Sequence, residues 1–228
     1  MKLAIIGYGK MGKNIEQLAA DFSFDVVNIF DIKENFEPLS QAALDKSDAE
    51  IFVEFTSPES AGENLLLLGQ NGCKVVSGST GWQAVLPEVE QAFRQNGGSF
   101  LHANNFSLGM QVFMEAARMM AEKIAQFQDY DAFLQEEHHR QKKDAPSGTA
   151  RQIQERVSAY FPNMDVAATR AGFIVGRHRL GFDGRFEQLR LEHIAKERRV
   201  FAEGALTAAK WLIKQEAGLY QFSDLFCH

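Results

Sequence analysis

The stretch Leu3-Ala4-Ile5-Ile6-Gly7-Tyr8-Gly9-Lys10-Met11-Gly12 joins a short apolar run to three closely spaced glycines. A helical pattern of apolar residues follows at once, with Ile15, Leu18 and Ala19. This order indicates a strand, a tight turn and a helix. The glycines match G-x-G-x-x-G, a turn whose backbone N–H groups can approach a pyrophosphate at the start of a helix. Because glycine turns after strands are common, the match alone is weak evidence, and the strands and helices that follow it provide the support.

The segments that follow repeat the alternation of strand and helix. Apolar runs at residues 26–30, 51–55, 74–77 and 99–103 predict strands. Helices are predicted from about residue 59 to 70 and through Val85, Val89 and Phe93. Strands that alternate with helices at this spacing form a parallel sheet. The predicted fold class is therefore α/β, with a Rossmann-like doubly wound parallel sheet whose ligands lie beyond the carboxyl ends of the strands.

Asp31 stands at the end of the second predicted strand, close to the spacing at which a carboxylate meets the ribose of a dinucleotide. Its charge repels a 2′-phosphate and favours NAD, whereas Lys33 can offset that repulsion, so that NADP use remains open. Turns that follow the strands are expected to line one crevice and contact the cofactor, although ordinary turn chemistry also accounts for them. These turns lie at Gly7, at Gly78, Ser79 and Thr80, and at Asn104.

The regular alternation of strands and helices ends near Phe106. A helix is predicted at residues 108–127, an extended segment at 130–137 and a helix from 147 to about 160. Strands are predicted around 166–175 and 185–194, with Asp183-Gly184 as a turn, and a last helix at 204–217. This half is therefore predicted to be α+β. We expect one domain of residues 1–106 with 204–228, and a second domain of residues 107–203.

Titratable groups crowd into residues 136–150, which read Glu-Glu-His-His-Arg-Gln-Lys-Lys-Asp-Ala-Pro-Ser-Gly-Thr-Ala. Ser147 or Thr149 can cap the following helix, whose first turn offers N–H groups and the positive end of the helix dipole to a carboxylate or phosphate. His138 titrates near neutral pH and can carry a proton. A solvated charged loop is the alternative interpretation. Side chains that can supply the other half of an anion site are His139, Arg140 and Lys142.

The composition limits the possible functions. A net charge of -6 argues against a nucleic-acid partner held by bulk electrostatics. Cys73 and Cys227 make no disulfide framework, are interpreted as structural, and fit a reducing compartment. The apolar run before Gly7 is too short for a signal peptide, and no later run approaches membrane-spanning length. We therefore expect a cytoplasmic protein without a membrane partner.

One long motif occurs in order beside the dinucleotide fingerprint: Glu137-His138-His139, then Lys142, then Asp144 to Ala150. Supporting motifs are Gly78-Ser79-Thr80-Gly81, Asn105-Phe106-Ser107 and Arg170-Ala171-Gly172. On these residues the chain resembles, over nearly its whole length, the dihydrodipicolinate reductases, also called 4-hydroxy-tetrahydrodipicolinate reductases, of bacterial diaminopimelate and lysine synthesis.

The resemblance implies an oxidoreductase that transfers a hydride from NADH or NADPH to a cyclic, unsaturated pyridine dicarboxylate. It also implies a homotetramer built through the second domain, an acid–base role for His138, and a proton-donating or carboxylate-clamping role for Lys142. No metal ligand is expected. The implied substrate-binding residues are His139, Ser147, Gly148 and Thr149. The implied cofactor contacts are Gly7, Tyr8, Gly9, Lys10, Met11, Gly12, Asp31, Gly78, Ser79, Thr80, Ala103, Asn104, Asn105 and Phe106.

The chain departs from the family pattern in its glycine turn, which is one residue shorter than is common, and at Gln141, where a histidine is frequent. Two other interpretations keep the dinucleotide-binding half. One is another two-domain nicotinamide dehydrogenase acting on a small carboxylate, and the other is a non-catalytic, dinucleotide-sensing protein. A sensor has no evident need for His138, Lys142 and the Ser147-Gly148-Thr149 turn together, which favours the reductase.

Overall fold

The computed structural model describes residues 1–33, 35–127 and 129–226. They form two compact units: unit 1 is Met1–Phe106 with the segment from Phe201 onward, and unit 2 is Ser107–Val200. Cys227, which the sequence suggests is structural, lies outside the described residues. None of the described helices combines the length and apolar character needed to cross a bilayer.

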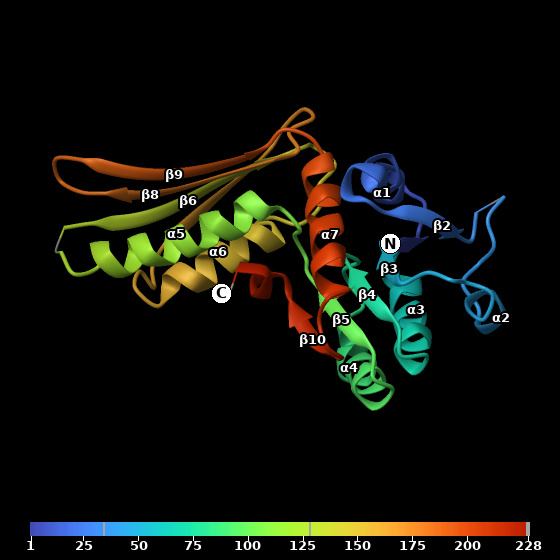
Figure 1. Cartoon of the computed structure of the whole chain (residues 1–228). Helices are drawn as coiled ribbons and strands as arrows, with labels where there is room; N and C mark the ends of the chain where they lie inside the picture. Colours follow the sequence, from blue (N-terminus) through green and yellow to red (C-terminus); the bar gives the residue numbers. More distant parts are fainter. Residues whose placement is uncertain (34, 128, 227–228) are drawn as a thin grey trace. The chain divides into compact units, whose positions relative to one another are not determined.

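The described part of unit 1 is built on a six-stranded sheet in which all neighbouring strands are parallel (Figure 1). Leu3, Ala4 and Ile5 are fully buried, as expected of a central parallel strand covered on both faces. The strand order β10-β5-β4-β3-β1-β2 reverses between β1 and β3, where sheets of this kind bind ligands. The predicted Rossmann-like fold is confirmed. The strands are β1 (Lys2–Ile6), β2 (Asp25–Phe30), β3 (Ile51–Glu54), β4 (Lys74–Ser77), β5 (Ser99–His102) and β10 (Gly218–Gln221).

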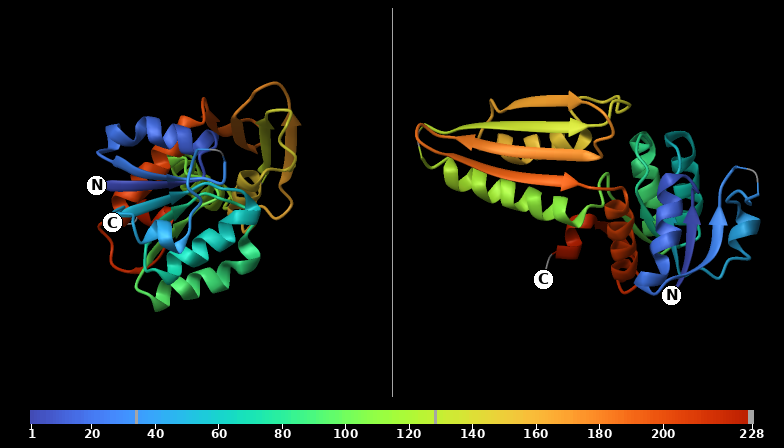
Figure 2. Two further views of the ribbon diagram at one scale, coloured as in Figure 1. Left: turned by 90° about the vertical axis from the view of Figure 1, so that its right-hand side faces the viewer. Right: turned by 90° about the horizontal axis from the view of Figure 1, so that it is seen from above.

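Helices cover both faces of this sheet (Figure 2). α3 and α4 pack side by side, and their apolar residues share one core cluster with the sheet. Within that cluster the rings of Phe93 and Phe100 stack with centroids 4.8 Å apart. The helices are α1 (Lys10–Ala19), α2 (Gln41–Leu44), α3 (Pro58–Gln70), α4 (Leu86–Gln95) and α7 (Arg199–Leu212), with 3-10 turns η1 (Ala20–Phe22), η2 (Gln83–Val85) and η3 (Phe222–Phe226).

The C-terminal segment differs from the sequence expectation. The helix predicted at residues 204–217 spans Arg199–Leu212, and β10, which the sequence did not reveal, pairs with β5. A Cβ atom at Gly204 would lie 1.7 Å from the carbonyl oxygen of Phe106. Close packing of small residues therefore fixes the position of α7. β10 reads Gly-Leu-Tyr-Gln and contains no β-branched residue that would favour a strand.

The described part of unit 2 is a four-stranded mixed sheet covered on one face by α5 and α6. Its order is β7-β6-β8-β9, with β6 parallel to β7 and antiparallel to β8. The other face carries ion pairs, among them Arg177 with Glu137 and Arg179 with Glu192. The elements are α5 (Leu108–Ile124), β6 (Asp131–His138), α6 (Gly148–Ser158), β7 (Asp165–Arg170), β8 (Gly176–Asp183) and β9 (Gln188–Ala195).

Between α6 and α7 the sequence predicted two strands, where the described residues form three. β7 already ends at Arg170, and β8 was not predicted. β8 alternates buried His178, Leu180 and Phe182 with two arginines. Its arginines and glycines lower the local hydropathy, so a search for apolar runs alone assigns this segment to a loop.

Candidate active site

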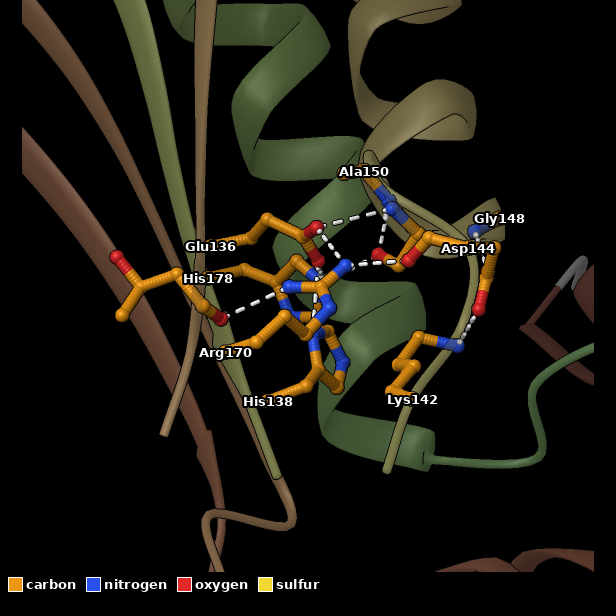
Figure 3. A network of polar contacts seen from close by, with 10 residues as sticks. Glu136, His138, Lys142, Asp144, Gly148, Ala150, Arg170 and His178 are labelled. Carbon is orange, nitrogen blue, oxygen red and sulfur yellow. Dashed lines mark hydrogen bonds and ion pairs between the residues drawn. The ribbon is translucent and has the colours of Figure 1, made fainter. Parts of the chain in front are cut away.

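A polar network lies in unit 2, where the C-terminal end of β6 approaches the start of α6 (Figure 3). β6 alternates buried and less buried residues, and both Glu136 and His138 belong to its buried set. The Glu136 side chain is fully buried, and that of His138 is 9% exposed. Arg170 ends β7 and His178 lies in β8, so strand pairing brings both to the same place as Glu136.

Glu136 is the centre of this network. Its Oε1 atom accepts hydrogen bonds from the backbone N–H of Ser147 at 3.0 Å and from Nη2 of Arg170 at 2.7 Å. Its Oε2 atom lies 2.8 Å from Nδ1 of His138, although the N–H direction is not aligned for a good hydrogen bond. Burial alone would raise the pKa of Glu136, but the hydrogen bonds from Ser147 and Arg170 outweigh it and hold that pKa below its ordinary value. Glu136 is therefore an ionised, buried carboxylate.

The two histidines of the network are neutral at neutral pH. Burial lowers the pKa of His138, an effect that Glu136 opposes and nearby cations reinforce. Burial also lowers the pKa of His178, to about 3. The rings meet edge to face with centroids 5.2 Å apart, and Nε2 of His178 lies 3.4 Å from Oγ of Ser147.

The loop after β6 carries the cation that the sequence singled out. Nζ of Lys142 lies 2.8 Å from Oδ1 of Asp144, and the other oxygen of Asp144 accepts a hydrogen bond from the backbone N–H of Gly148 at 3.3 Å. Burial would raise the pKa of Asp144, but Lys142 outweighs this and lowers it. Both side chains keep solvent contact, at 26% and 45% exposure, so a ligand can reach them. Asp144 thus binds an ammonium group and a helix N-terminus, the two features expected to hold a ligand carboxylate.

The start of α6 resolves an alternative that the sequence left open. Ser147 is the N-cap, because its Oγ atom accepts a hydrogen bond from the backbone N–H of Ala150 at 3.1 Å. Thr149 lies inside the first turn of the helix, and His139 lies in the turn directly after β6. The structure therefore brings His138, Lys142 and the capping turn into one site.

Three side chains of the network also offer possible metal ligands. Atoms of Glu136, His138 and His178 lie within 4.8 Å of one another. However, the Arg170 guanidinium already supplies the positive charge that Glu136 needs, at 2.7 Å. We therefore interpret the group as a hydrogen-bonded network that orients the imidazoles.

The glycine turn of unit 1 has the geometry of a phosphate cradle. Gly7 has a φ of 90°, and a Cβ atom there would lie 2.4 Å from the carbonyl oxygen of Phe55. A Cβ atom at Gly12 would lie 2.2 Å from the carbonyl oxygen of Gly7, whereas one at Gly9 would meet no atom within 4 Å. Gly9 caps α1 without a side-chain hydrogen bond. The turn is thus tight on its inner side and open where a pyrophosphate would approach the helix N-terminus.

Asp31 lies beside this turn. Its carboxylate accepts hydrogen bonds from the backbone N–H of Tyr8 at 2.5 Å and of Lys33 at 2.9 Å. The Tyr8 ring packs against Phe36, with centroids 4.8 Å apart. This position suits recognition of a ribose next to the pyrophosphate.

The turns after β4 and β5 reach the same edge of the sheet as Gly7, because all these strands are parallel. Ala103, Asn104 and Asn105 follow β5, and Gly78, Ser79 and Thr80 follow β4. The Ser79 hydroxyl is engaged by the protein, since it donates to Glu54 at 2.8 Å and accepts from the Thr56 N–H at 2.8 Å. The Phe106 ring is buried among Phe55 and Phe222. Contacts of Ser79 and Phe106 with a cofactor would therefore use their backbone atoms.

Sequence reasoning missed the buried carboxylates. Glu54 is fully buried at the end of β3 and accepts hydrogen bonds from Ser77, Ser79 and Thr56. A charged residue that ends an apolar strand was the available signal. For Glu136 the signal was its place in the alternation of β6, on the face shared with His138.

Two family models match almost the whole chain. The model described as Dihydrodipicolinate reductase, N-terminus, matches residues 1–106, and the model described as Dihydrodipicolinate reductase, C-terminus, matches residues 109–226. The 4-hydroxy-tetrahydrodipicolinate reductase of Christiangramia forsetii is 30% identical over 238 residues, which cover 99% of this chain and 97% of that relative. The reductase of Methanospirillum hungatei is 32% identical, with 99% and 98% covered.

Solved structures show the same fold. A dihydrodipicolinate reductase from Paenisporosarcina sp. TG-14, with dipicolinate bound, has a TM-score of 0.78 at 22% identity, and the match covers 99% of both chains. The two family models, together with relatives of 30% identity or more, establish the relationship. The chain belongs to the dihydrodipicolinate reductase family.

Proposed function

We propose that this oxidoreductase reduces 4-hydroxy-tetrahydrodipicolinate to tetrahydrodipicolinate with NADH or NADPH, in diaminopimelate and lysine biosynthesis. The substrate gains a hydride and a proton and loses its hydroxyl group as water. Family membership supports the proposal, as do relatives named for this activity. The observation that carries it is the buried Glu136–His138–Arg170 network beside Lys142 and the N-terminus of α6.

Unit 1 provides the proposed dinucleotide-binding domain, which we assign to residues 1–106 with 204–228. Its open glycine turn fits a pyrophosphate, and the Asp31 carboxylate fits the adjacent ribose. The bound dinucleotide supplies the hydride. Asp31 favours NADH, and Lys33 leaves NADPH open. The residues assigned to cofactor binding are Gly7, Tyr8, Gly9, Lys10, Met11, Gly12, Asp31, Gly78, Ser79, Thr80, Ala103, Asn104, Asn105 and Phe106.

Unit 2 provides the proposed substrate-binding and oligomerisation domain, assigned to residues 107–203. The substrate is a dianion, and the Lys142 ammonium and the first turn of α6 are suited to its carboxylates. Holding both carboxylates orients the ring, so much of the rate enhancement comes from positioning. The residues assigned to substrate binding are His139, Ser147, Gly148 and Thr149.

His138 and Lys142 are the proposed catalytic residues. Burial and neighbouring cations lower the pKa of His138 in the ligand-free protein. A bound dianion adds negative charge and raises that pKa, so substrate binding favours proton uptake by the imidazole. The imidazolium can then protonate the ring as the hydride arrives. Lys142 clamps a carboxylate or donates the proton itself.

We further propose that the enzyme is cytoplasmic and forms a homotetramer through the β-sheet of unit 2. The sheet face opposite α5 and α6 supports this, because it carries ion pairs and lies away from the core that the two helices share with the sheet. Light scattering should give four times the mass of one chain. A monomer at micromolar concentration would contradict the oligomer proposal and leave the activity proposal intact.

The activity test is the loss of NADH absorbance with freshly generated 4-hydroxy-tetrahydrodipicolinate, repeated with NADPH. 2,6-Pyridinedicarboxylate, a planar dianion, should inhibit competitively with the substrate. His138→Gln should bind this dianion but turn over roughly a hundredfold more slowly or worse. Absence of turnover by a protein that binds NADH would reject the reductase proposal and favour another dehydrogenase or a sensor.

A further inference from the structure

We propose that Glu136 is a positioning residue that keeps the proton of His138 on Nδ1 and leaves Nε2 as the nitrogen that exchanges a proton with the substrate. The inference rests on the proposed function, because it deepens the acid–base role assigned there to His138. Glu136 itself contacts no substrate and transfers no proton.

The two oxygens of Glu136 have separate partners. Oε1 accepts from two donors that come from different elements, the N–H of Ser147 at 3.0 Å and Nη2 of Arg170 at 2.7 Å. These donors fix the carboxylate plane, and Oε2 then lies 2.8 Å from Nδ1 of His138. Two lone pairs at that distance repel each other, so Nδ1 carries the hydrogen. The misaligned N–H direction is typical of a catalytic contact that tightens when the imidazole becomes charged.

The other side of the ring is kept clear. Nδ1 of His138 is buried, so the 9% exposure of the side chain belongs to its other atoms. β8 passes this side at Gly176, where an added Cβ atom would lie 3.2 Å from Nε2 of His138. A glycine at this position therefore leaves space at the nitrogen that has to meet a ligand.

The proton balance follows from this arrangement. Binding of the dianion brings one proton from solvent to Nε2, and the imidazolium then holds hydrogens on both nitrogens. During the reduction the Nε2–H bond would break and the proton would move to the substrate ring, to which a bound dinucleotide would supply the hydride. His138 returns to the neutral form with its hydrogen on Nδ1, which Glu136 stabilises throughout.

Several charged or titratable groups act on His138 at the same time. They come from β6, β7, β8 and the loop after β6, and they are Glu136, Arg170, His178, Lys142 and Asp144. Of these, Glu136 is the carboxylate in contact with the imidazole nitrogen, so its replacement has a local effect on the tautomer that the others do not share.

Glu136→Gln tests the inference. The donors at Ser147 and Arg170 require an oxygen, so the amide oxygen takes the place of Oε1 and the amide NH₂ faces His138. Nδ1 must then accept, and the hydrogen moves to Nε2, the wrong form for proton uptake there. We expect kcat to fall roughly a hundredfold or more, with KM changed by less than about threefold. Nitrogen NMR of the imidazole should show the hydrogen on Nδ1 in the wild type and on Nε2 in the variant.

Glu137→Gln is the matched control. Glu137 is the next residue, but its side chain is 30% exposed on the opposite face and pairs with Arg177 at 3.4 Å. It should keep wild-type kcat, pH profile and imidazole spectrum. Equal losses in both variants would mean that the effect is structural and would overturn the inference.

The nitrogen NMR spectrum of the wild type tests the inference even if Glu136→Gln does not fold. A hydrogen on Nε2 of His138 in the wild type would contradict the inference. An unchanged spectrum or an unchanged kcat in a folded Glu136→Gln protein would do the same. Failure of the proposed function is a different result: the wild type would show no turnover, while the imidazole spectrum would still report the effect of Glu136.

Discussion

Replacing Gly9 by alanine separates the stability of the glycine turn from its proposed use. Gly9 has a φ of -80° and a ψ of -154°, which alanine adopts without strain, and a Cβ atom there meets nothing within 4 Å. We expect the free energy of unfolding to stay unchanged or to rise by about 0.4–1 kcal/mol. The methyl group would occupy space that a pyrophosphate needs, so NADH affinity should fall about tenfold or more, which corresponds to about 1.4 kcal/mol.

Gly12→Ala is the matched contrast within the same turn. Its Cβ atom would lie 2.2 Å from the carbonyl oxygen of Gly7, well inside the 3.0 Å that real Cβ atoms keep. Since the contact is with backbone, α1 has to shift, at a cost of about 1–3 kcal/mol. The melting temperature should fall by roughly 2–4 °C per kcal/mol, and NADH affinity should fall with it.

Thermal unfolding and calorimetric NADH binding measure the two effects separately. Binding of 2,6-pyridinedicarboxylate is the internal control, because its proposed site belongs to unit 2. A Gly9→Ala protein that binds NADH with wild-type affinity would refute the phosphate-cradle reasoning. A large loss of stability in that variant would refute the geometry on which it rests.

The remaining predictions concern the buried histidine, the loop lysine and the buried carboxylate of unit 1. The pKa of His178 is about 3 in the folded protein and about 6.5 in the unfolded chain. Its contribution to the free energy of unfolding is therefore complete above about pH 6.5 and is lost as the pH falls toward 3. Urea titrations should show that this free energy depends less steeply on pH in His178→Leu than in the wild type. Lys142→Met should weaken 2,6-pyridinedicarboxylate binding by roughly tenfold or more, and an intact maximal rate would exclude Lys142 as proton donor. Glu54→Leu should lower the free energy of unfolding by about 1–3 kcal/mol, because the hydroxyls of Ser77 and Ser79 lose their acceptor; an unchanged denaturation midpoint would contradict this.

Local signals made the first half of the fold predictable. β1, the glycine turn and α1 follow one another in the chain, and β4 was predicted with the bounds that it has. Where position depends on distant residues, the sequence was less informative. α7 is set by its contact with the Phe106 carbonyl, and β10 forms only because β5 is beside it. Both conditions are tertiary and leave no periodic pattern.

For the candidate site, too, only the local features could be predicted from the sequence. The run from His138 to Thr149 is local in sequence, so the loop and the capped helix could be anticipated. The partners of Glu136 could not, because they depend on strand register: Glu136 lies opposite His178 across the β6–β8 pair, and His138 lies opposite Arg170 across the β6–β7 pair. A shift of one residue in either pairing would place these side chains on the other face of the sheet.

Asp144 gives the ligand-free protein a carboxylate of its own between Lys142 and Gly148. An incoming carboxylate that uses these two groups must displace it, so binding there is an exchange of one anion for another. The tethered competitor acts at an effective concentration on the order of millimolar. A monocarboxylate gains little from such an exchange. A dianion brings a second charge that the Asp144 carboxylate does not mimic, so we expect displacement of this aspartate to favour dicarboxylates.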